Sequence, residues 1–268
     1  MPGKNPPDRE FKSWHANGQL HKHKFYRNGK PEGEYKSWRA DGSLHEEKFY
    51  RNGMPEGECK WWDRDGKLME LTIYRNGKRE GEDQSWYENG QLKSCSFYRK
   101  GVPEGEYILW YQNGCIRSHQ VYRNGKLEGV SKGWYENGQS QWVSLYKNNL
   151  MKGNSKYWRE NGQRWIDGNY HEGLRHGTHR VWHKNGRIET LEFYQNGDVV
   201  GESKAWNENG NLTNHEYHGY DFHDNFTSAR RFFARTKDIM KRKFLHEKYT
   251  ILDMILISDL IKETAYEV

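Results

Sequence analysis

Apolar and polar positions follow a short recurring pattern along most of this chain. Residues 33–39 mix polar and aromatic side chains, Asp41-Gly42 interrupts them, and residues 43–50 form a second mixed segment. Such segments are typical of strands, and an Asp-Gly pair supplies the positive-φ positions of a tight turn. The pattern predicts a β-hairpin around Asp41-Gly42, followed by a proline- and glycine-containing loop, 52–57, that leads into the next hairpin.

The hairpin pattern recurs every 24 residues without insertion or deletion. Nine of the 12 tryptophans mark the period: Trp14, Trp38, Trp62, Trp86, Trp110, Trp134, Trp158, Trp182 and Trp206. A tyrosine stands twelve residues after each of the first eight: Tyr26, Tyr50, Tyr74, Tyr98, Tyr122, Tyr146, Tyr170 and Tyr194. A fixed period of this length indicates a repeat architecture in which each unit packs on its neighbours.

The period predicts an all-β repeat array, an elongated single antiparallel meander of nine hairpins over residues 10–218. Two strands per copy at roughly 4.8 Å spacing would extend the sheet to about 90 Å. Composition agrees with an array: only 33% of residues are hydrophobic and the mean hydropathy is −1.23, yet 15% are aromatic. Disordered chains are poor in aromatic residues, so order without a large core is expected. Residues 1–9 are predicted to be a flexible N-terminus.

The tryptophan and tyrosine columns, with an apolar column eleven residues after each tryptophan, are expected to stabilise the sheet by packing. The apolar column contains Phe25, Phe49, Ile73, Phe97, Val121, Leu145 and Phe193. A ligand cage built from the aromatic side chains is the alternative interpretation.

The pattern Tyr-x-Asn-Gly-x-x-x-Gly-Glu-x-x-x-Trp-x-x-Asn-Gly-x-Leu resembles the variant MORN repeat. The resemblance covers residues 10–218, and it implies a non-enzymatic scaffold of β-hairpins. That variant occurs in antitoxin-like bacterial proteins and in arrays of large DNA viruses, which implies a virion-structural or toxin-neutralising role as one alternative. The copies depart from the pattern at Asn148-Asn149, Arg164, Asn169 and Glu172. Functional divergence is therefore expected in residues 140–180.

The 24-residue pattern stops after Gly219. Apolar residues at helical spacing predict two amphipathic helices in residues 219–268, the first basic in its charged residues and the second acidic. These helices are expected either to cover the last strand of the sheet, since open strand edges invite strand addition, or to dock a partner.

Two columns of cations accompany the aromatic columns. One precedes the tryptophan by two residues: Lys12, Lys36, Lys60, Lys132, Lys156, Arg180 and Lys204. The other follows the tyrosine: Arg27, Arg51, Arg75, Arg99, Arg123 and Lys147. Such rows could contact nucleic acid or an anionic membrane surface. Glutamates two residues before the lysine column, as at Glu34 and Glu58, are expected to pair with it and weaken that field.

Sequence signatures of catalysis, cofactor binding and metal binding are absent. No nucleophile, phosphate-loop or dinucleotide motif is present, and repeated glutamates lack the single special environment of a catalytic acid. The set His176, His179 and His183 would be too widely spaced on a strand for shared zinc ligation, and the pair His21 and His23 lacks a third ligand. No catalytic residue, metal or cofactor is expected.

The sequence therefore predicts a cytoplasmic protein-interaction scaffold with an unidentified protein partner, virion-associated if the source is viral. Binding of an anionic membrane or nucleic acid through the cation columns is the alternative. The three cysteines have no metal-site spacing and are expected to be free thiols. No apolar stretch is long enough to cross a membrane or resembles a signal peptide.

Overall fold

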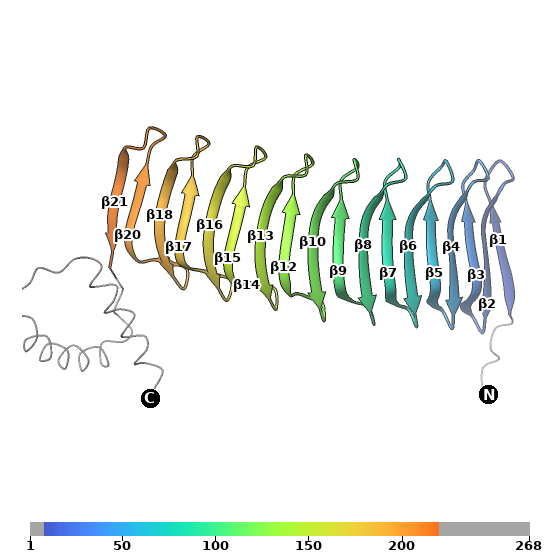
Figure 1. Ribbon diagram of the computed structural model, residues 1–268. Helices are drawn as coiled ribbons and strands as arrows, with labels where there is room; N and C mark the ends of the chain where they lie inside the picture. Colours follow the sequence, from blue (N-terminus) through green and yellow to red (C-terminus); the bar gives the residue numbers. More distant parts are fainter. Residues whose placement is uncertain (1–7, 220–268) are drawn as a thin grey trace, which may run out of the picture. The chain divides into compact units, whose positions relative to one another are not determined.

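The computed structural model describes residues 8–219, and in them every regular element is a β-strand. The chain divides into two units, residues 1–218 and 219–268. The two helices predicted in residues 219–268 lie outside the described residues. The strands of the first unit form one sheet of 21 strands, which Figure 1 shows side by side in chain order.

The strands have the following bounds: β1 Arg9–Trp14, β2 Leu20–Arg27, β3 Lys30–Trp38, β4 Leu44–Arg51, β5 Met54–Trp62, β6 Leu68–Arg75, β7 Lys78–Trp86, β8 Leu92–Arg99, β9 Val102–Trp110, β10 Ile116–Arg123, β11 Lys126–Leu127, β12 Gly129–Trp134, β13 Ser140–Lys147, β14 Leu150–Met151, β15 Gly153–Trp158, β16 Arg164–His171, β17 Leu174–Trp182, β18 Ile188–Gln195, β19 Asp198–Val199, β20 Gly201–Trp206 and β21 Leu212–His218.

The long strands pair antiparallel in chain order, from β1–β2 through β20–β21. Three short strands, β11, β14 and β19, continue into β12, β15 and β20 after one residue, and both members of each pair contact the same preceding strand. Counted as single strands, they leave eighteen, two for each of nine copies. The predicted meander is confirmed.

The two kinds of turn differ in backbone conformation. After the tryptophan, Gly42 has φ +85°, whereas Asp41 is not among the positive-φ residues, so the glycine alone takes the left-handed conformation predicted for both. Asp41 instead accepts the backbone N–H of Ser43 through Oδ1 at 2.9 Å. After the tyrosine, Asn52 and Gly53 both have positive φ, 52° and 84°, as a two-residue type I′ turn requires.

The second predicted loop, 52–57, is mostly strand. β5 begins at Met54, directly after the two-residue turn, and Pro55 lies within it opposite Tyr50. A proline is tolerated there because its carbonyl, rather than the missing N–H, makes the bond: Gly77 N donates to Pro55 O at 2.9 Å. The expectation that this proline belongs to the turn is wrong, because Gly57, at φ 76°, makes a bulge inside a longer strand.

Candidate functional site: the two faces of the sheet

On one face of the sheet the side chains bury one another, and on the other face the apolar side chains are exposed. Because successive side chains of a strand point to opposite faces, the tyrosine column and the apolar column one residue before it lie on opposite sides. We call these sides the tyrosine face and the phenylalanine face. Their burial differs, and that difference identifies the side whose apolar column is exposed.

On the tyrosine face, large side chains lie over small ones on neighbouring strands. Ser131, Ser144 and Ser155 are 0–1% exposed although no second layer covers them within residues 8–219. A Cβ on Gly133 would come within 2.2 Å of Nε1 of Trp142, and one on Gly168 within 2.5 Å of the ring of His179. These glycines permit the rings to lie directly on the backbone, and the same rings bury the backbone of a single-layer sheet.

Burial on the tyrosine face changes the pKa of its ionisable groups. Burial raises the pKa of the Tyr146 and Tyr157 hydroxyls, which therefore stay protonated at neutral pH. Burial lowers the pKa of His179, and nearby Arg175 lowers it further. His179 packs edge-on against Tyr194, with ring centroids 5.6 Å apart. Around Tyr146, Tyr157 and His179, this face is therefore packed mainly with neutral groups.

The phenylalanine face exposes its apolar column. Phe25, Phe49, Phe97, Leu145 and Phe193 are 37–44% exposed. These side chains were expected to be packing stabilisers, but the sheet has a single described layer, so nothing within residues 8–219 covers them. Exposed apolar side chains in a row mark an interaction surface.

Charges beside this column change along the array. In copies 1–3, lysine pairs with the glutamate two residues earlier: Lys12 with Glu10 at 2.7 Å and Lys60 with Glu58 at 2.5 Å. In the strands β12, β15 and β17 the glutamate position holds valine, asparagine and threonine. Within residues 8–219, the corresponding cations make no ion pair: Lys132, Lys156 and Arg180.

The second cation column lies beside the asparagine-glycine turns. Arg27 contacts Asp8 at 3.5 Å and Glu32 at 3.7 Å. The other members are exposed and form no ion pair with a described residue: Arg51, Arg75, Arg99, Arg123 and Lys147. The predicted cation columns are therefore accessible. The predicted pairing with glutamate holds for the lysine column in copies 1–3 and again in copy 9, where Lys204 pairs with Glu202 at 2.5 Å.

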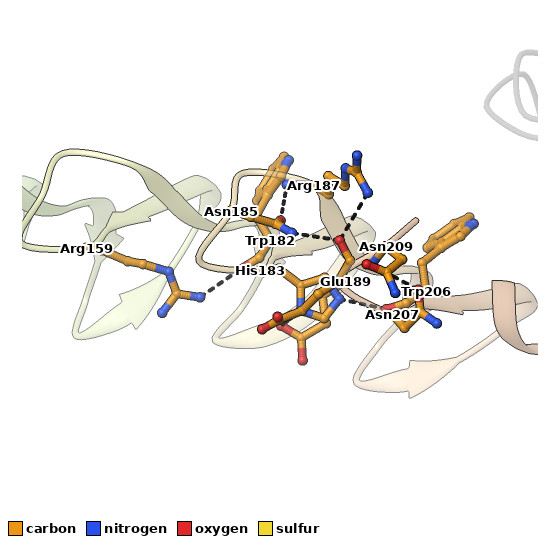
Figure 2. Close-up of polar contacts among 10 residues, drawn as sticks. Arg159, Trp182, His183, Asn185, Arg187, Glu189, Trp206, Asn207 and Asn209 are labelled. Atoms are coloured by element: carbon orange, nitrogen blue, oxygen red, sulfur yellow. Dashed lines mark hydrogen bonds and ion pairs between the residues drawn. The ribbon is translucent and has the colours of Figure 1, made fainter. Parts of the chain in front are cut away.

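Adjacent copies are joined by side chains at both ends of the strands. At seven of the eight junctions, the residue after a tryptophan donates to the carbonyl of the next tryptophan, as Tyr111 does to Trp134 at 2.9 Å and His183 to Trp206 at 2.7 Å. The exception is Asp63 in copy 3, whose carboxylate accepts backbone N–H groups of its own turn. The turn asparagine donates to the carbonyl two residues after the next tryptophan, as when Asn185 donates to Glu208 O at 2.7 Å. Figure 2 shows this ladder around His183 and Asn185.

At the opposite ends of the strands, a glutamate of one copy accepts the backbone N–H of the next turn. Glu56 Oε2 accepts from Asn76 N at 2.7 Å, and Glu104 Oε2 from Asn124 N at 2.7 Å. The roles of these glutamates, and of the donors that follow the tryptophans, were not predicted from the sequence. Their 24-residue spacing was the available signal, but spacing does not reveal which group bonds across a junction.

The variant MORN repeat model matches residues 10–28, 31–52, 55–76, 79–100, 127–148 and 175–197. The chain belongs to the MORN repeat variant family. Each MORN match spans two strands of the sheet, as 31–52 spans β3 and β4. The unmatched stretches 101–126 and 149–174 carry the same strand pairs, β9–β10 and β15–β16, so the departures at Asn149 and Arg164 leave the MORN hairpin intact.

Crystal structures that resemble the MORN array are those of TcdB2-TccC3, TcdB2-TccC3-Cdc42 and TcdB2-TccC3 without its hypervariable C-terminal region. Sequence identities are 10%, 10% and 9%, with TM-scores of 0.20, 0.14 and 0.14. The matches cover 74%, 78% and 79% of this chain but 14%, 17% and 17% of those chains. TM-scores this low do not establish a shared fold. No curated protein matches the chain.

The MORN frame places the histidines considered as metal ligands in separate structural roles. His179 is 4% exposed on the tyrosine face, His183 bonds the Trp206 carbonyl, and His176 Nδ1 lies 3.5 Å from Asn196 N. His23 pairs with Glu10 at 2.7 Å. His21, on the same strand β2, does not share this contact, and burial lowers its pKa. Among residues 8–219 no group of three or more His, Cys, Asp or Glu side chains is placed to hold a metal ion.

All three cysteines, Cys59, Cys95 and Cys115, are free, as predicted. In the described part of the chain no helix is long and apolar enough to cross a membrane.

Proposed function

We propose that the MORN array is a non-enzymatic scaffold that binds protein partners through its phenylalanine face. The observation that carries this proposal is the row of exposed apolar side chains, Phe49, Phe97 and Leu145 among them, each 38–40% exposed. Two strands separate successive members, so they recur at about 10 Å. A row of anchors at constant spacing suits an extended partner that crosses several copies.

Phe97→Asn tests the proposal because Asn169 already occupies the same column position in another copy. We expect the variant to fold and to lose a partner that wild-type protein captures reproducibly from cell extract. Tyr107→Phe, on the tyrosine face, is the matched control and should retain the partner. If Phe97→Asn and Leu145→Asn capture every partner as well as wild type does, the phenylalanine face is not the interaction surface.

A second candidate function is binding of an anionic membrane surface or nucleic acid. It is favoured by Lys132, Lys156 and Arg180, which lie in consecutive copies and form no ion pair with any residue of the range 8–219. Association would weaken steeply with salt, because it releases counterions. Replacing all three by glutamine should abolish binding to phosphatidylserine vesicles or single-stranded DNA, whereas Lys60→Gln, at a glutamate-paired position, should change binding little.

A cytoplasmic location follows from this proposal as an expectation and is supported by the three free thiols, which are typical of a reducing compartment. Virion-structural or toxin-neutralising roles stay predictions from the family resemblance.

A further inference from the structure

Copy 3 places a tryptophan where other copies have a smaller residue. The position before the repeat tryptophan holds serine in copies 1, 2 and 4, and Trp61 in copy 3. Trp61 lies on the tyrosine face and is 38% exposed, unlike the serines, of which Ser37 is 3% exposed. The Arg39 guanidinium lies over this ring, 5.9 Å from its centroid, so the indole already contacts one cation of the chain itself.

Two glutamates flank Trp61 across the strands. In the register of β4, β5 and β6, Glu46 lies opposite Trp61 on one side and Glu70 opposite it on the other. Cross-strand partners on one face are about 5 Å apart at Cβ, so both carboxylates reach the edges of the indole. An aromatic ring between two carboxylates is a favourable environment for a cation.

The two carboxylates differ in their partners: Glu46 is in an ion pair, and Glu70 accepts one long hydrogen bond. Lys48 Nζ bonds Glu46 at 2.6 Å and lies over the ring of Tyr35, 4.8 Å from its centroid. Glu70 accepts a 3.4 Å hydrogen bond from the Thr72 hydroxyl and has no cationic partner in residues 8–219. Glu70 therefore supplies an uncompensated negative charge beside Trp61.

A hollow lies beside Trp61, and a hydrogen bond to His45 holds the indole in position. Glu46, Trp61, Glu70 and Tyr74 are among the residues that line a space of about 330 Å³, large enough for a side-chain head group. Lys48 and Lys60 line it too, and each is paired with a glutamate of its own strand. The indole N–H of Trp61 donates to His45 Nε2 at 2.7 Å, which fixes the ring. Burial lowers the pKa of His45, as does nearby Arg39, so the imidazole stays neutral and able to accept this bond.

We propose that the hollow beside Trp61 binds an alkylguanidinium or alkylammonium group, supplied by a basic side chain of a protein partner or by a free polyamine. The cation lies against the indole and pairs with Glu70, and the Glu46–Lys48 pair borders the site. This site is on the opposite face from the apolar column, so it is independent of the scaffold proposal.

Titration calorimetry on the full chain tests the site with three probes: N-acetyl-arginine amide, spermidine and the neutral analogue N-acetyl-citrulline amide. We expect saturable binding of at least one cation and none of the citrulline compound. Tighter binding of the arginine compound identifies a protein side chain as the source, and tighter binding of spermidine identifies a polyamine.

The variants Trp61→Ser and Glu70→Gln should each weaken cation binding about tenfold, a loss within the range of a desolvated cation–π contact. Trp61→Ser introduces the residue that copies 1, 2 and 4 carry, so the hairpin should fold. Trp165→Ser, at a tryptophan 40% exposed in another copy, and Glu82→Gln, on the phenylalanine face, are the matched controls. The proposal is overturned if no cation binds saturably, or if Trp61→Ser and Glu70→Gln bind it as tightly as the controls do.

Discussion

At the scale of single residues, the same column position has different consequences in different copies. Internal repeat tryptophans such as Trp110 are partly buried between neighbouring strands, whereas Trp14, in the first strand, is 59% exposed. A column therefore predicts a place in the hairpin but not a degree of burial. That degree depends on whether a neighbouring strand is present on both sides.

The tryptophan column gives a direct test of this difference. Trp110→Ala should lower the free energy of unfolding by about 3 kcal/mol, the low end of the range for removing a packed tryptophan, because the ring is only partly buried. Trp14→Ala should cost less than about 1 kcal/mol. Urea denaturation measures both, and equal losses would show that burial of Trp110 does not stabilise the array.

His179 makes stability depend on pH. Its pKa is lowered in the folded state by burial first and then by Arg175, so below the ordinary histidine pKa of about 6.5 the unfolded chain binds a proton that the folded chain does not. The stability contributed by the neutral imidazole is therefore complete above that pH and is lost as pH falls through the lowered folded-state pKa. His179→Ser, which copies Ser131 and Ser155 of this column, should flatten the difference between urea midpoints at pH 7.5 and pH 5. An unchanged difference would assign the pH dependence to other groups.

At the scale of the element, the unit is the hairpin together with the bonds that it sends forward. Asn113 uses both ends of its amide: Oδ1 accepts from Cys115 N at 2.9 Å and Nδ2 donates to Glu136 O at 2.9 Å. Copies 2 and 3 have Asp41 and Asp65 at this position and lack the amide donor. In copy 3, Lys67 Nζ bonds the Glu88 carbonyl at 2.7 Å in its place.

Asn113→Asp separates the two bonds, because it keeps the acceptor and removes the donor. We expect a loss of about 1 kcal/mol, the usual contribution of one hydrogen bond, expressed at the junction of copies 5 and 6. Amide hydrogen exchange should show faster exchange on both sides of that junction and unchanged exchange at distant copies. Uniformly faster exchange would contradict a local role.

The sequence identified the hairpins but not how the copies are joined. Strands around each Asn-Gly follow from alternation and turn chemistry, and the 24-residue period fixes their order. Three features did not follow: the strand that already starts at Met54, the exposure of Phe49, and the bond from Tyr111 to Trp134. Each depends on what lies across a strand junction, and a periodic sequence gives no information on whether a second layer covers a face. Trp61 could have been noticed as a departure from a column of smaller residues.

At the scale of the whole molecule, every strand contacts its chain neighbours, so each copy depends on the two beside it. Deleting one complete copy in register, residues 79–102, should leave a folded array of eight copies. β6 would then pair with the equivalent of β7 in the next copy. Circular dichroism should remain that of a β-sheet, and unfolding should stay cooperative with a smaller urea dependence. The control is a deletion of 12 residues, half a period. It removes one strand of a hairpin, so the following strands would have to run in the wrong direction to pair, and the neighbouring copies should unfold.

The order of the strands also sets how the array responds to force. Its strands run across the long direction of the sheet, so tension applied to residues 8 and 218 loads the hydrogen bonds of one terminal strand at a time rather than all of them together. Each hairpin that peels away frees 24 residues, roughly 80 Å of extended chain. At the tryptophan ends of the strands, the side-chain donor belongs to one copy and the carbonyl acceptor to the next. There, peeling from β21 leaves unpaired donors on the remaining array, whereas peeling from β1 leaves unpaired acceptors. The array is thus extensible when it is pulled from its ends, and its two ends differ in the groups that opening exposes.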